Sequence, residues 1–275
     1  MLRTCRSGHI DELVTLLEAG INVVSTARFV TVGHSGPGAA QRVTKAAMRG
    51  GASLHGTGMN PAWANAVALV AAGFCRRVGR ISVLESVDCS FYASKRNWTA
   101  FGFGRPVDDP ILANDLNEHQ PEYREAMDAM AGALGVELDS FECDVEFAAA
   151  TGDIDLGYTT IPSDCVAGLR EHGTGMYDGA PLLELPMVWK LGRGMEPDWP
   201  LLNGYEIKID GDPSLRSRFR HRPDTSDGTF DLGVSTAMPT VNPIPAVCAA
   251  APGIVTIADL PLVTAAHLVR PRRDR

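Results

Sequence analysis

Hydrophobic positions in the first sixty residues switch between helical spacing and short apolar runs. A first helix is predicted by apolar residues three or four positions apart, namely Ile10, Leu13, Val14 and Leu17. Gly20 ends that helix, and the β-rich run 21–26 follows directly as a buried parallel strand. A second helix over 39–49 and a second short strand over 52–55 repeat the order. This alternation is typical of an α/β protein with a parallel sheet.

The pattern changes after residue 80, where longer strands take over. We expect a strand over 81–91, a loop over 97–117, a helix over 121–134 and a return to helix after residue 237. Five further strands are predicted at 141–148, 165–172, 182–191, 205–209 and 215–220. Strands joined by short turns favour a mostly antiparallel, open sheet. Such a sheet, with few helices to cover it, commonly packs on a neighbouring domain or forms a dimer interface.

The amino-acid composition limits the size of the core and the kinds of partner that the protein can bind. The 275 residues are 45% hydrophobic, enough to bury a sizeable core in one large domain or two small ones. The formal charge of −8 argues against a nucleic-acid or anionic-membrane surface. No secretory signal is recognisable, and Pro245 and Pro252 interrupt the longest apolar tract, so no membrane span is predicted. The six cysteines are scattered without a CxxC pair, which favours reduced thiols in a cytoplasmic protein and no metal site.

The stretch with the clearest chemical meaning reads His-Gly-Thr-Gly-Met-Asn-Pro over residues 55–61. Asn60 is a favoured helix N-cap, and Pro61 suits the first helical position because its missing N–H would be unpaired there. The loop is therefore expected to present free backbone N–H groups at the positive end of a helix. Such a place suits a polar or anionic ligand, so we expect the loop to lie across a cofactor or substrate.

Three stretches in a fixed order resemble one known family. They are Glu-Ala-Gly-Ile-Asn-Val-Val-Ser-Thr at 18–26, Gly-Thr-Gly-Met-Asn-Pro at 56–61 and Thr-Ala-Met-Pro-Thr-Val-Asn-Pro-Ile-Pro-Ala-Val at 236–247. Together they look like the dihydrodipicolinate reductase-like group, which includes diaminopentanoate dehydrogenase and the NAD(P)H-dependent amine dehydrogenases. The resemblance extends from about residue 9 to about residue 262.

That resemblance implies a fold and an activity. The implied fold class is α/β, with a partial Rossmann-type parallel sheet plus an α+β domain that has a mostly antiparallel open sheet. Residues 1–60 would be a remnant of the dinucleotide-binding domain, 61–232 a substrate and dimerisation domain, and 233–275 a C-terminal helix returning to the Rossmann side. Family members move a hydride between NAD(P)H and an imine or amine carbon of a small-molecule substrate, and we expect a homodimer.

The resemblance also implies cofactor contacts, and the sequence departs from the family in two places. The contacts expected for NADP or NAD are Ser25, Thr26, Gly56, Thr57, Gly58, Asn60 and Asn242. Family members carry a strand and a GxGxxG turn upstream, and this sequence contains no such turn. Pyrophosphate binding depends on that turn, so dinucleotide affinity is expected to be weakened. The glutamate that amine dehydrogenases place after the strand at 21–26 is also missing, since residues 27–30 read Ala-Arg-Phe-Val.

Hydride transfer also needs a group that manages a proton, and the candidates are His34, His55, Glu85 and Asp88. His34 lies in a glycine-rich loop, as a site residue or as a solvated histidine. His55 precedes the glycine loop, as a site residue or as a hydrogen-bonded structural histidine. Glu85 and Asp88 lie three positions apart on one strand and therefore face opposite sides of the sheet, which argues against a paired carboxylate site.

Other conspicuous side chains are interpreted as structural. Tyr123, Met127 and Met130 recur on one helix face and are expected in the core. Trp189 and Trp199 are expected in sheet packing or a dimer contact. Four alternating arginines share one strand face, either solvated or directed at an acidic partner surface: Arg216, Arg218, Arg220 and Arg222.

Two functional hypotheses stay open at this point. The first is an oxidoreductase of the dihydrodipicolinate reductase-like group that uses NAD(P)H. The alternative is a catalytically silent, truncated homologue that acts at most as a dimerising or binding protein. Binding of NADH or NADPH distinguishes the two, because only the first hypothesis requires it.

Overall fold

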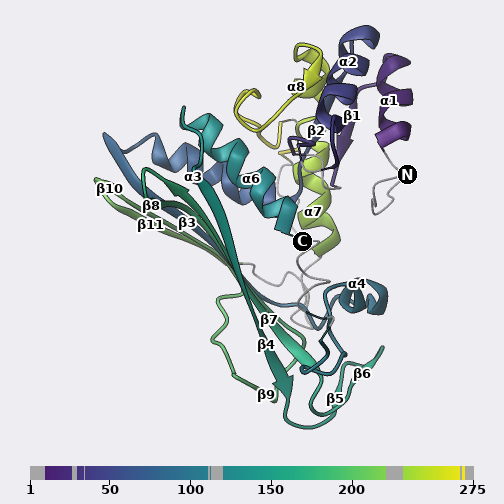
Figure 1. Cartoon of the computed structure of the whole chain (residues 1–275), viewed down its shortest axis with the longest axis vertical. Coiled ribbons are helices and arrows are strands. Elements are labelled where there is room, and N and C mark those ends of the chain that lie inside the picture. The colour runs from purple at the N-terminus through teal and green to yellow at the C-terminus, as the bar shows by residue number, and fades with distance from the viewer. Residues whose placement is uncertain are drawn as a thin grey trace, which may run out of the picture. The chain divides into compact units, whose positions relative to one another are not determined.

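The computed structural model divides the chain into two compact units (Figure 1). Unit 1 consists of Met1–Ala66 and Gly233–Arg275, and unit 2 consists of Val67–Leu232. The residues that the structure describes are 10–26, 30–33, 35–110, 112, 120–220, 232–266 and 268–269. Unit 1 therefore combines two segments that are far apart in the sequence.

Unit 1 contains a three-stranded parallel sheet in the order β1-β2-β12. Its strands are β1 (Val23–Ser25), β2 (Ser53–Gly56) and β12 (Gly253–Ile254). The side chain of Asn22 supports the sheet, because its Oδ1 accepts a hydrogen bond from the Ser53 N–H at 2.8 Å. The predicted parallel sheet is confirmed. Its third strand is only two residues long, too short to leave an alternating pattern in the sequence.

Helices α1 (Ile10–Glu18) and α2 (Ala39–Gly50) pack together in unit 1. Their buried positions recur at helical spacing, and Leu17 and Val43 are fully buried. The helices approach closely at Gly50, where a Cβ atom would lie 1.8 Å from the Leu17 carbonyl oxygen. Two more helices come from the C-terminal segment, α7 (Leu232–Val241) and α8 (Ile244–Ala249).

The helix after β2 begins differently from the prediction. A π-helical turn, η2 (Met59–Trp63), comes first, and α3 (Ala64–Ala72) continues it. The N-cap is Gly58, with φ 149° and ψ −167°, and no side chain caps the turn. The prediction of Asn60 as N-cap is therefore wrong, because the glycine conformation lets the chain enter the helix before Asn60. Pro61 still lies in the first turn, where a missing N–H costs no hydrogen bond.

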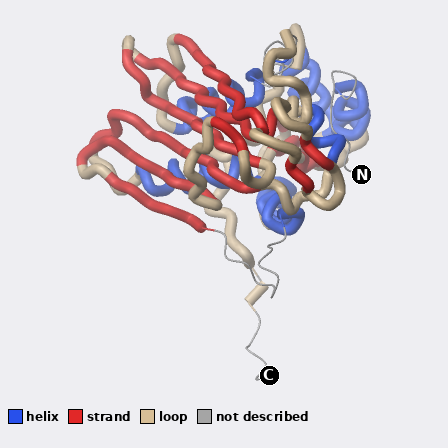
Figure 2. Tube along the Cα trace, turned by 90° about the horizontal axis from the view of Figure 1, so that it is seen from below, coloured by secondary structure: helices blue, strands red, loops and turns tan. Residues whose placement is uncertain are grey.

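Unit 2 is built on a seven-stranded sheet in the order β11-β10-β3-β8-β7-β4-β9. Figure 2 shows the strands of the structure in red. The strands are β3 (Arg77–Asp88), β4 (Ser140–Ala150), β7 (Val166–Tyr177), β8 (Ala180–Lys190), β9 (Met195–Glu196), β10 (Gly204–Asp212) and β11 (Leu215–Arg220). β3 and β8 are parallel, and the other neighbouring pairs in this order are antiparallel. A separate hairpin is formed by β5 (Ile154–Asp155) and β6 (Thr160–Ile161). The mostly antiparallel sheet is confirmed.

One face of this sheet packs against α6 (Gln120–Ala133) (Figure 1). Gly173 and Gly175 on β7 leave room there for the Met127 side chain, since a Cβ at either glycine would lie 3.2 Å from a Met127 atom. A second, short helix, α4 (Lys95–Ala100), occupies part of the segment predicted as a loop. Six residues cover fewer than two helical turns, too few for a repeating pattern, and the helix is anchored by the buried Trp98. Among the described residues, no helix is long and apolar enough to span a membrane.

Candidate functional site

The carboxyl ends of β1 and β2 meet at one edge of the parallel sheet of unit 1. Ser25 lies opposite Gly56 in the register, and the Thr57 N–H donates to the Ser25 carbonyl oxygen at 2.8 Å. Thr26 follows β1 directly, so this edge brings together Ser25, Thr26, Gly56, Thr57 and Gly58. In open α/β sheets, ligands bind outside the carboxyl ends of the strands. Five of the seven predicted cofactor contacts therefore lie where that rule expects a ligand.

The glycine loop is fixed to α7 by one side chain. The Thr57 hydroxyl donates to the Pro239 carbonyl oxygen at 3.3 Å. That carbonyl would pair with the N–H of residue 243 in a helix, but residue 243 is a proline and has no N–H. Thr57 thus satisfies an acceptor that the helix leaves open. Gly58 is the adjacent position without a side chain, and the space where its Cβ would lie is open for at least 4 Å.

The two remaining predicted contacts are the polar side chains of Asn60, just after the glycine loop, and Asn242, just after α7. Asn60 is the second residue of η2 and is half-buried. Asn242 follows α7, is half-buried, and donates its backbone N–H to the Met238 carbonyl oxygen at 2.9 Å. Their roles in cofactor binding stay predictions.

His55 is engaged in the sheet. Its side chain is buried, and the ring Nδ1 lies 2.7 Å from the Val255 carbonyl oxygen, which follows β12. Burial lowers the pKa of His55, although the hydrogen bond to Val255 and the charge of Asp259 act in the opposite direction. These contacts are those of a hydrogen-bonded structural histidine, the second of the two interpretations given to this residue.

Asp88 lies at the end of β3 and organises a turn. Its Oδ1 accepts hydrogen bonds from the backbone N–H groups of Ser90 at 2.9 Å and Gly192 at 3.4 Å. The first contact closes a local turn and the second ties β3 to the segment after β8, so the carboxylate has a role in backbone structure. His34, another of the proton candidates, lies outside the described residues.

The structure of unit 2 brings together a group of buried acids and phenols. The sequence singled out Glu85 as a proton candidate and Tyr123 as a core residue, but it did not predict that they meet. We call this group the acid–phenol cluster: Glu85, Glu171, Tyr123 and Tyr205. Strand register places Tyr205, Glu85, Met187 and Glu171 in one row across β10, β3, β8 and β7. Tyr123 reaches this row from α6, with its hydroxyl 3.0 Å from the Met187 sulfur. The two carboxyl groups are 4% and 3% exposed, respectively.

Burial governs the protonation of this cluster. It raises the pKa of Glu171 to about 7, while a hydrogen bond from Tyr123 acts to lower it. The pKa values of Tyr123 and Tyr205 lie well above the usual range, first because of burial and then because of the nearby glutamates. Glu85 accepts a hydrogen bond from the Trp189 indole N–H at 3.0 Å. A carboxyl group with a pKa near 7 can hold or release a proton at neutral pH.

One sequence signal could have found this cluster. Glu85 has the same phase along β3 as the buried Ile81, Val83 and Val87, and Glu171 has the phase of Leu169 on β7. A glutamate at an apolar phase of an alternating strand is expected inside, where it needs a partner or a raised pKa. Among the described residues, no group of three or more His, Cys, Asp or Glu side chains is placed to hold a metal ion.

Comparison with known proteins places the chain in a family. The family model for the 2,4-diaminopentanoate dehydrogenase C-terminal domain matches residues 67–272, about three quarters of the chain. The chain belongs to this family. The matched range begins with unit 2 and continues through the C-terminal segment of unit 1.

Individual proteins that are similar to this chain have names that match this family assignment. An amine dehydrogenase from Streptomyces virginiae is 24% identical over 270 residues, which are 92% of this chain and 73% of the relative. A 2,4-diaminopentanoate dehydrogenase from Acetoanaerobium sticklandii is 25% identical over 269 residues, 92% of this chain and 70% of the relative. The solved structure of an amine dehydrogenase from Mycobacterium smegmatis has the same fold. It superposes with a TM-score of 0.75 at 22% identity and covers 96% of this chain and 75% of that one.

Proposed function

We propose that this protein is an oxidoreductase that acts on the amine or imine carbon of a small molecule. The observation that carries the proposal is the family match over residues 67–272, joined by relatives named amine dehydrogenase and 2,4-diaminopentanoate dehydrogenase. The finer part of the proposal is hydride transfer with NADP or NAD, within the dihydrodipicolinate reductase-like group. The order of the three motifs at 18–26, 56–61 and 236–247 supports that finer part.

The residues at the β1–β2 edge fit a dinucleotide in two respects. The edge is the carboxyl end of a parallel sheet, and Gly58 leaves open space beside the backbone where any other residue would place a Cβ atom. A flat ring can therefore approach the backbone of 56–58 closely. In this proposal Gly56, Thr57 and Gly58 hold the nicotinamide end, and the Thr57 hydroxyl keeps the loop on α7. NAD(P)H would supply or accept the hydride.

Neither His55 nor Asp88 is proposed for the proton role. His55 donates its ring Nδ1–H to the Val255 carbonyl oxygen, and Asp88 Oδ1 accepts from the Ser90 N–H, so both side chains hold backbone structure. In unit 2, the Glu171 carboxyl group has a pKa of about 7, and the Tyr123 hydroxyl hydrogen-bonds to it. Both protonation states of Glu171 are therefore populated near neutral pH. Tyr123 orients the carboxyl group by hydrogen bonding to its charged form.

A cytoplasmic location is part of the same proposal. The five cysteines within the described residues are all free thiols, and free thiols persist in the reducing environment of the cytoplasm. The pools of NADH and NADPH that the proposed reaction needs are also there.

Two measurements on the full chain test the proposal. Calorimetry with NADH and NADPH up to millimolar concentration is expected to show binding of at least one of them. With that cofactor in its oxidised form, a panel of primary amines, including 2,4-diaminopentanoate, is then screened for formation of the reduced cofactor. Turnover of an amine supports the proposal. If neither cofactor binds, the proposal is wrong and the catalytically silent alternative is favoured.

A further inference from the structure

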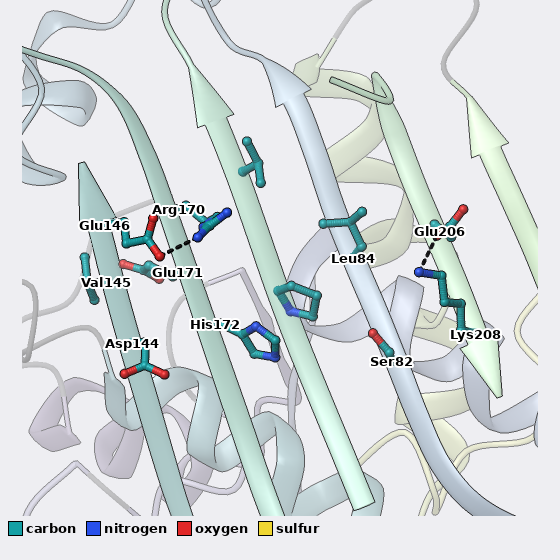
Figure 3. A pocket seen from close by; sticks show the side chains of 12 residues that line it. Ser82, Leu84, Asp144, Val145, Glu146, Arg170, Glu171, His172, Glu206 and Lys208 are labelled. Atoms are coloured by element: carbon teal, nitrogen blue, oxygen red, sulfur yellow. Dashed lines mark hydrogen bonds and ion pairs between the residues drawn. The ribbon is translucent and has the colours of Figure 1, made fainter. Parts of the chain in front are cut away.

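The face of the unit 2 sheet opposite α6 forms an open, hollowed surface, which we call the open face. A hollow of about 570 Å³ lies over it, and strands β3, β4, β7, β8 and β10 contribute side chains to its lining (Figure 3). The open face carries the residues of opposite phase to the acid–phenol cluster, because side chains alternate along each strand. Its charges are separated by strand, with arginines on β11 at one edge and the exposed acids Glu142, Asp144 and Glu146 on β4.

Strand β11 is one edge of the seven-stranded sheet. β10 lies on its inner side, and no strand among the described residues pairs with its outer side. All six residues of Leu215–Arg220 pair with β10 without a register shift, and none of them is a proline. Proteins protect edge strands by making them very short, by bulges, by proline or by charge, and only charge protects β11. The outer N–H and C=O groups of β11 therefore form a regular row that another strand can join.

The side chains of β11 are of two kinds that alternate along the strand. Arg216, Arg218 and Arg220 have the phase of the open face, and all three are exposed. Leu215 and Phe219 have the opposite phase, and each is half-buried. A strand that joins β11 would therefore meet a row of cations on one side and an apolar margin on the other.

The row of cations is held in place by one buried acid. Glu206 on β10 is bound by Arg216 at 2.8 Å, by Lys208 at 3.0 Å and by Arg218. Burial alone would raise the pKa of Glu206, but these hydrogen bonds outweigh it and hold the pKa at about 2. The acid therefore stays charged and fixes its three partners. Together with Arg220, four cations share one acid, so this edge keeps a net positive charge.

We propose that β11 binds an extended segment of a partner protein in which acidic and apolar residues alternate. The segment joins the sheet as a further strand, and its backbone pairs with the outer side of β11. Its acidic side chains lie beside Arg216, Arg218 and Arg220, and its apolar side chains cover Leu215 and Phe219. Backbone pairing gives affinity, and the two rows of side chains select the partner.

The charges of β11 decide against a second copy of this chain as the occupant. Antiparallel pairing of two β11 strands would bring two rows of arginines together, and like charges on neighbouring strands are destabilising. Strand β4 of a second copy carries alternating acids, but Glu146 there is already paired with Arg170. Pairing of β11 with β4 would also be heterologous and would extend into open filaments unless it closes. A separate segment fills the edge without this consequence.

Binding of a short synthetic peptide to the full chain tests the proposal. The probe is the capped peptide Asp-Val-Asp-Val-Asp-Val, which has the length of β11. The control peptide Asp-Asp-Asp-Val-Val-Val has the same composition and charge, but it cannot place its acids on one side of a strand. Calorimetry is expected to show saturable binding of the probe at millimolar concentration and about tenfold weaker binding of the control. Infrared spectroscopy with isotope-labelled peptide carbonyl groups is expected to show that the bound probe is a β-strand.

Charge reversal on β11 gives the test variant. Arg216→Glu with Arg220→Glu reverses most of the row and leaves Arg218 and Lys208 to hold Glu206. This variant is expected to bind the acidic probe about tenfold less tightly and to bind Lys-Val-Lys-Val-Lys-Val instead. Circular dichroism shows whether the sheet is retained. If the double variant folds poorly, Arg220→Glu alone is measured, because it leaves the partners of Glu206 unchanged.

A matched control variant separates a local effect from the total charge. Arg96→Glu with Arg193→Glu makes the same change in charge at two exposed arginines outside β11, and it is expected to bind the acidic probe as the unchanged protein does. The proposal is overturned if the unchanged protein does not bind the probe, if the control peptide binds equally well, or if the folded β11 variant keeps its affinity. Filaments of the unchanged protein that the β11 variant does not form would also overturn it, because β4 of a second copy would then be the occupant.

Discussion

At the scale of single residues, the chemistry of a side chain is decided by its phase along a strand. Glu171 and His172 are neighbours on β7, yet Glu171 is 3% exposed and His172 points to the open face, where it is half-buried. The buried acid titrates near neutral pH, and burial is the main cause. Glu85 and Asp88 differ in the same way, since Glu85 lies inside and Asp88 caps a turn at the strand end.

The raised pKa of Glu171 predicts a stability that falls as the pH rises. Between pH 4.5 and about 7 the folded protein binds a proton at Glu171 more tightly than the unfolded chain does. Unfolding therefore releases that proton, and the free energy of unfolding decreases with pH across this window. The pKa of Glu171 is 4.5 in the unfolded chain and about 7 in the folded protein. This difference lowers the free energy of unfolding by about 3 kcal/mol at high pH. Glu171→Gln is expected to remove most of this decline and to be more stable than the unchanged protein at pH 9.

Urea unfolding at pH 5 and pH 9 measures this effect. Glu137→Gln is the matched control, because it removes an exposed carboxyl group just before β4. The control is expected to retain the pH dependence of the unchanged protein. An equally steep decline in Glu171→Gln would show that Glu171 is not the titrating group.

Thr57 makes a second prediction at this scale. Thr57→Val keeps the shape of the side chain and removes the donor to the Pro239 carbonyl oxygen. The free energy of unfolding is expected to fall by about 1 kcal/mol, since that acceptor has no helical N–H to replace the hydroxyl. Binding of NADH or NADPH is expected to weaken in Thr57→Val and to recover in Thr57→Ser, which retains the hydroxyl. Calorimetry checks both variants. Equal affinity in Thr57→Val and Thr57→Ser would mean that the hydroxyl does not position the loop.

At the scale of elements, the alternating pattern was enough to predict the long strands. The strand predicted at 215–220 matches β11 residue for residue, and the helix predicted at 121–134 is α6 within one residue. Elements of two to six residues, such as β9, β12 and α4, were missed because they span fewer than two full periods of the strand or helix pattern. The π-helical start at Met59 was missed for another reason, since it depends on the backbone of Gly58 rather than on the capping preference of Asn60.

One part of the candidate site could be predicted from the sequence, and another part could not. The loop at 56–58 was predicted because its two glycines and the helix start that follows are consecutive in the sequence. The acid–phenol cluster was not found, because its members come from four elements and meet only through strand register. Glu171 and Tyr123 are 48 residues apart, and neither forms a local motif.

Replacement of two helical glycines by alanine is expected to change the free energy of unfolding in opposite directions. Gly50→Ala is expected to destabilise the protein by about 3 kcal/mol, because the new Cβ would lie 1.8 Å from the Leu17 backbone oxygen and would force α1 and α2 apart. Gly132→Ala is the matched change in α6, where nothing lies within 4 Å of the new atom. It is expected to stabilise the protein by about 0.5 to 1 kcal/mol, because alanine restricts the unfolded chain and favours helix. Urea unfolding of both variants measures the difference. A neutral Gly50→Ala would show that α1 and α2 are not in close contact.

At the scale of the whole molecule, the two units contain different functional features. Unit 1 provides a carboxyl strand edge with a glycine loop, and unit 2 provides a large sheet with a neutralisable acid on one face and a charge-patterned open face on the other. The family match extends over both units, from residue 67 to residue 272. The overall charge of −8 said little about this organisation, because the open face separates its charges by strand.

The central claim is that the protein transfers a hydride between a nicotinamide cofactor and the carbon that bears an amine. The most direct measurement uses NADH or NADPH deuterated at the transferred position, with a ketone and ammonia, and mass spectrometry of the amine product. The account predicts one deuterium on the carbon that carries the nitrogen, from whichever cofactor binds in calorimetry. An amine product without deuterium, or no product with a cofactor that binds, would contradict it.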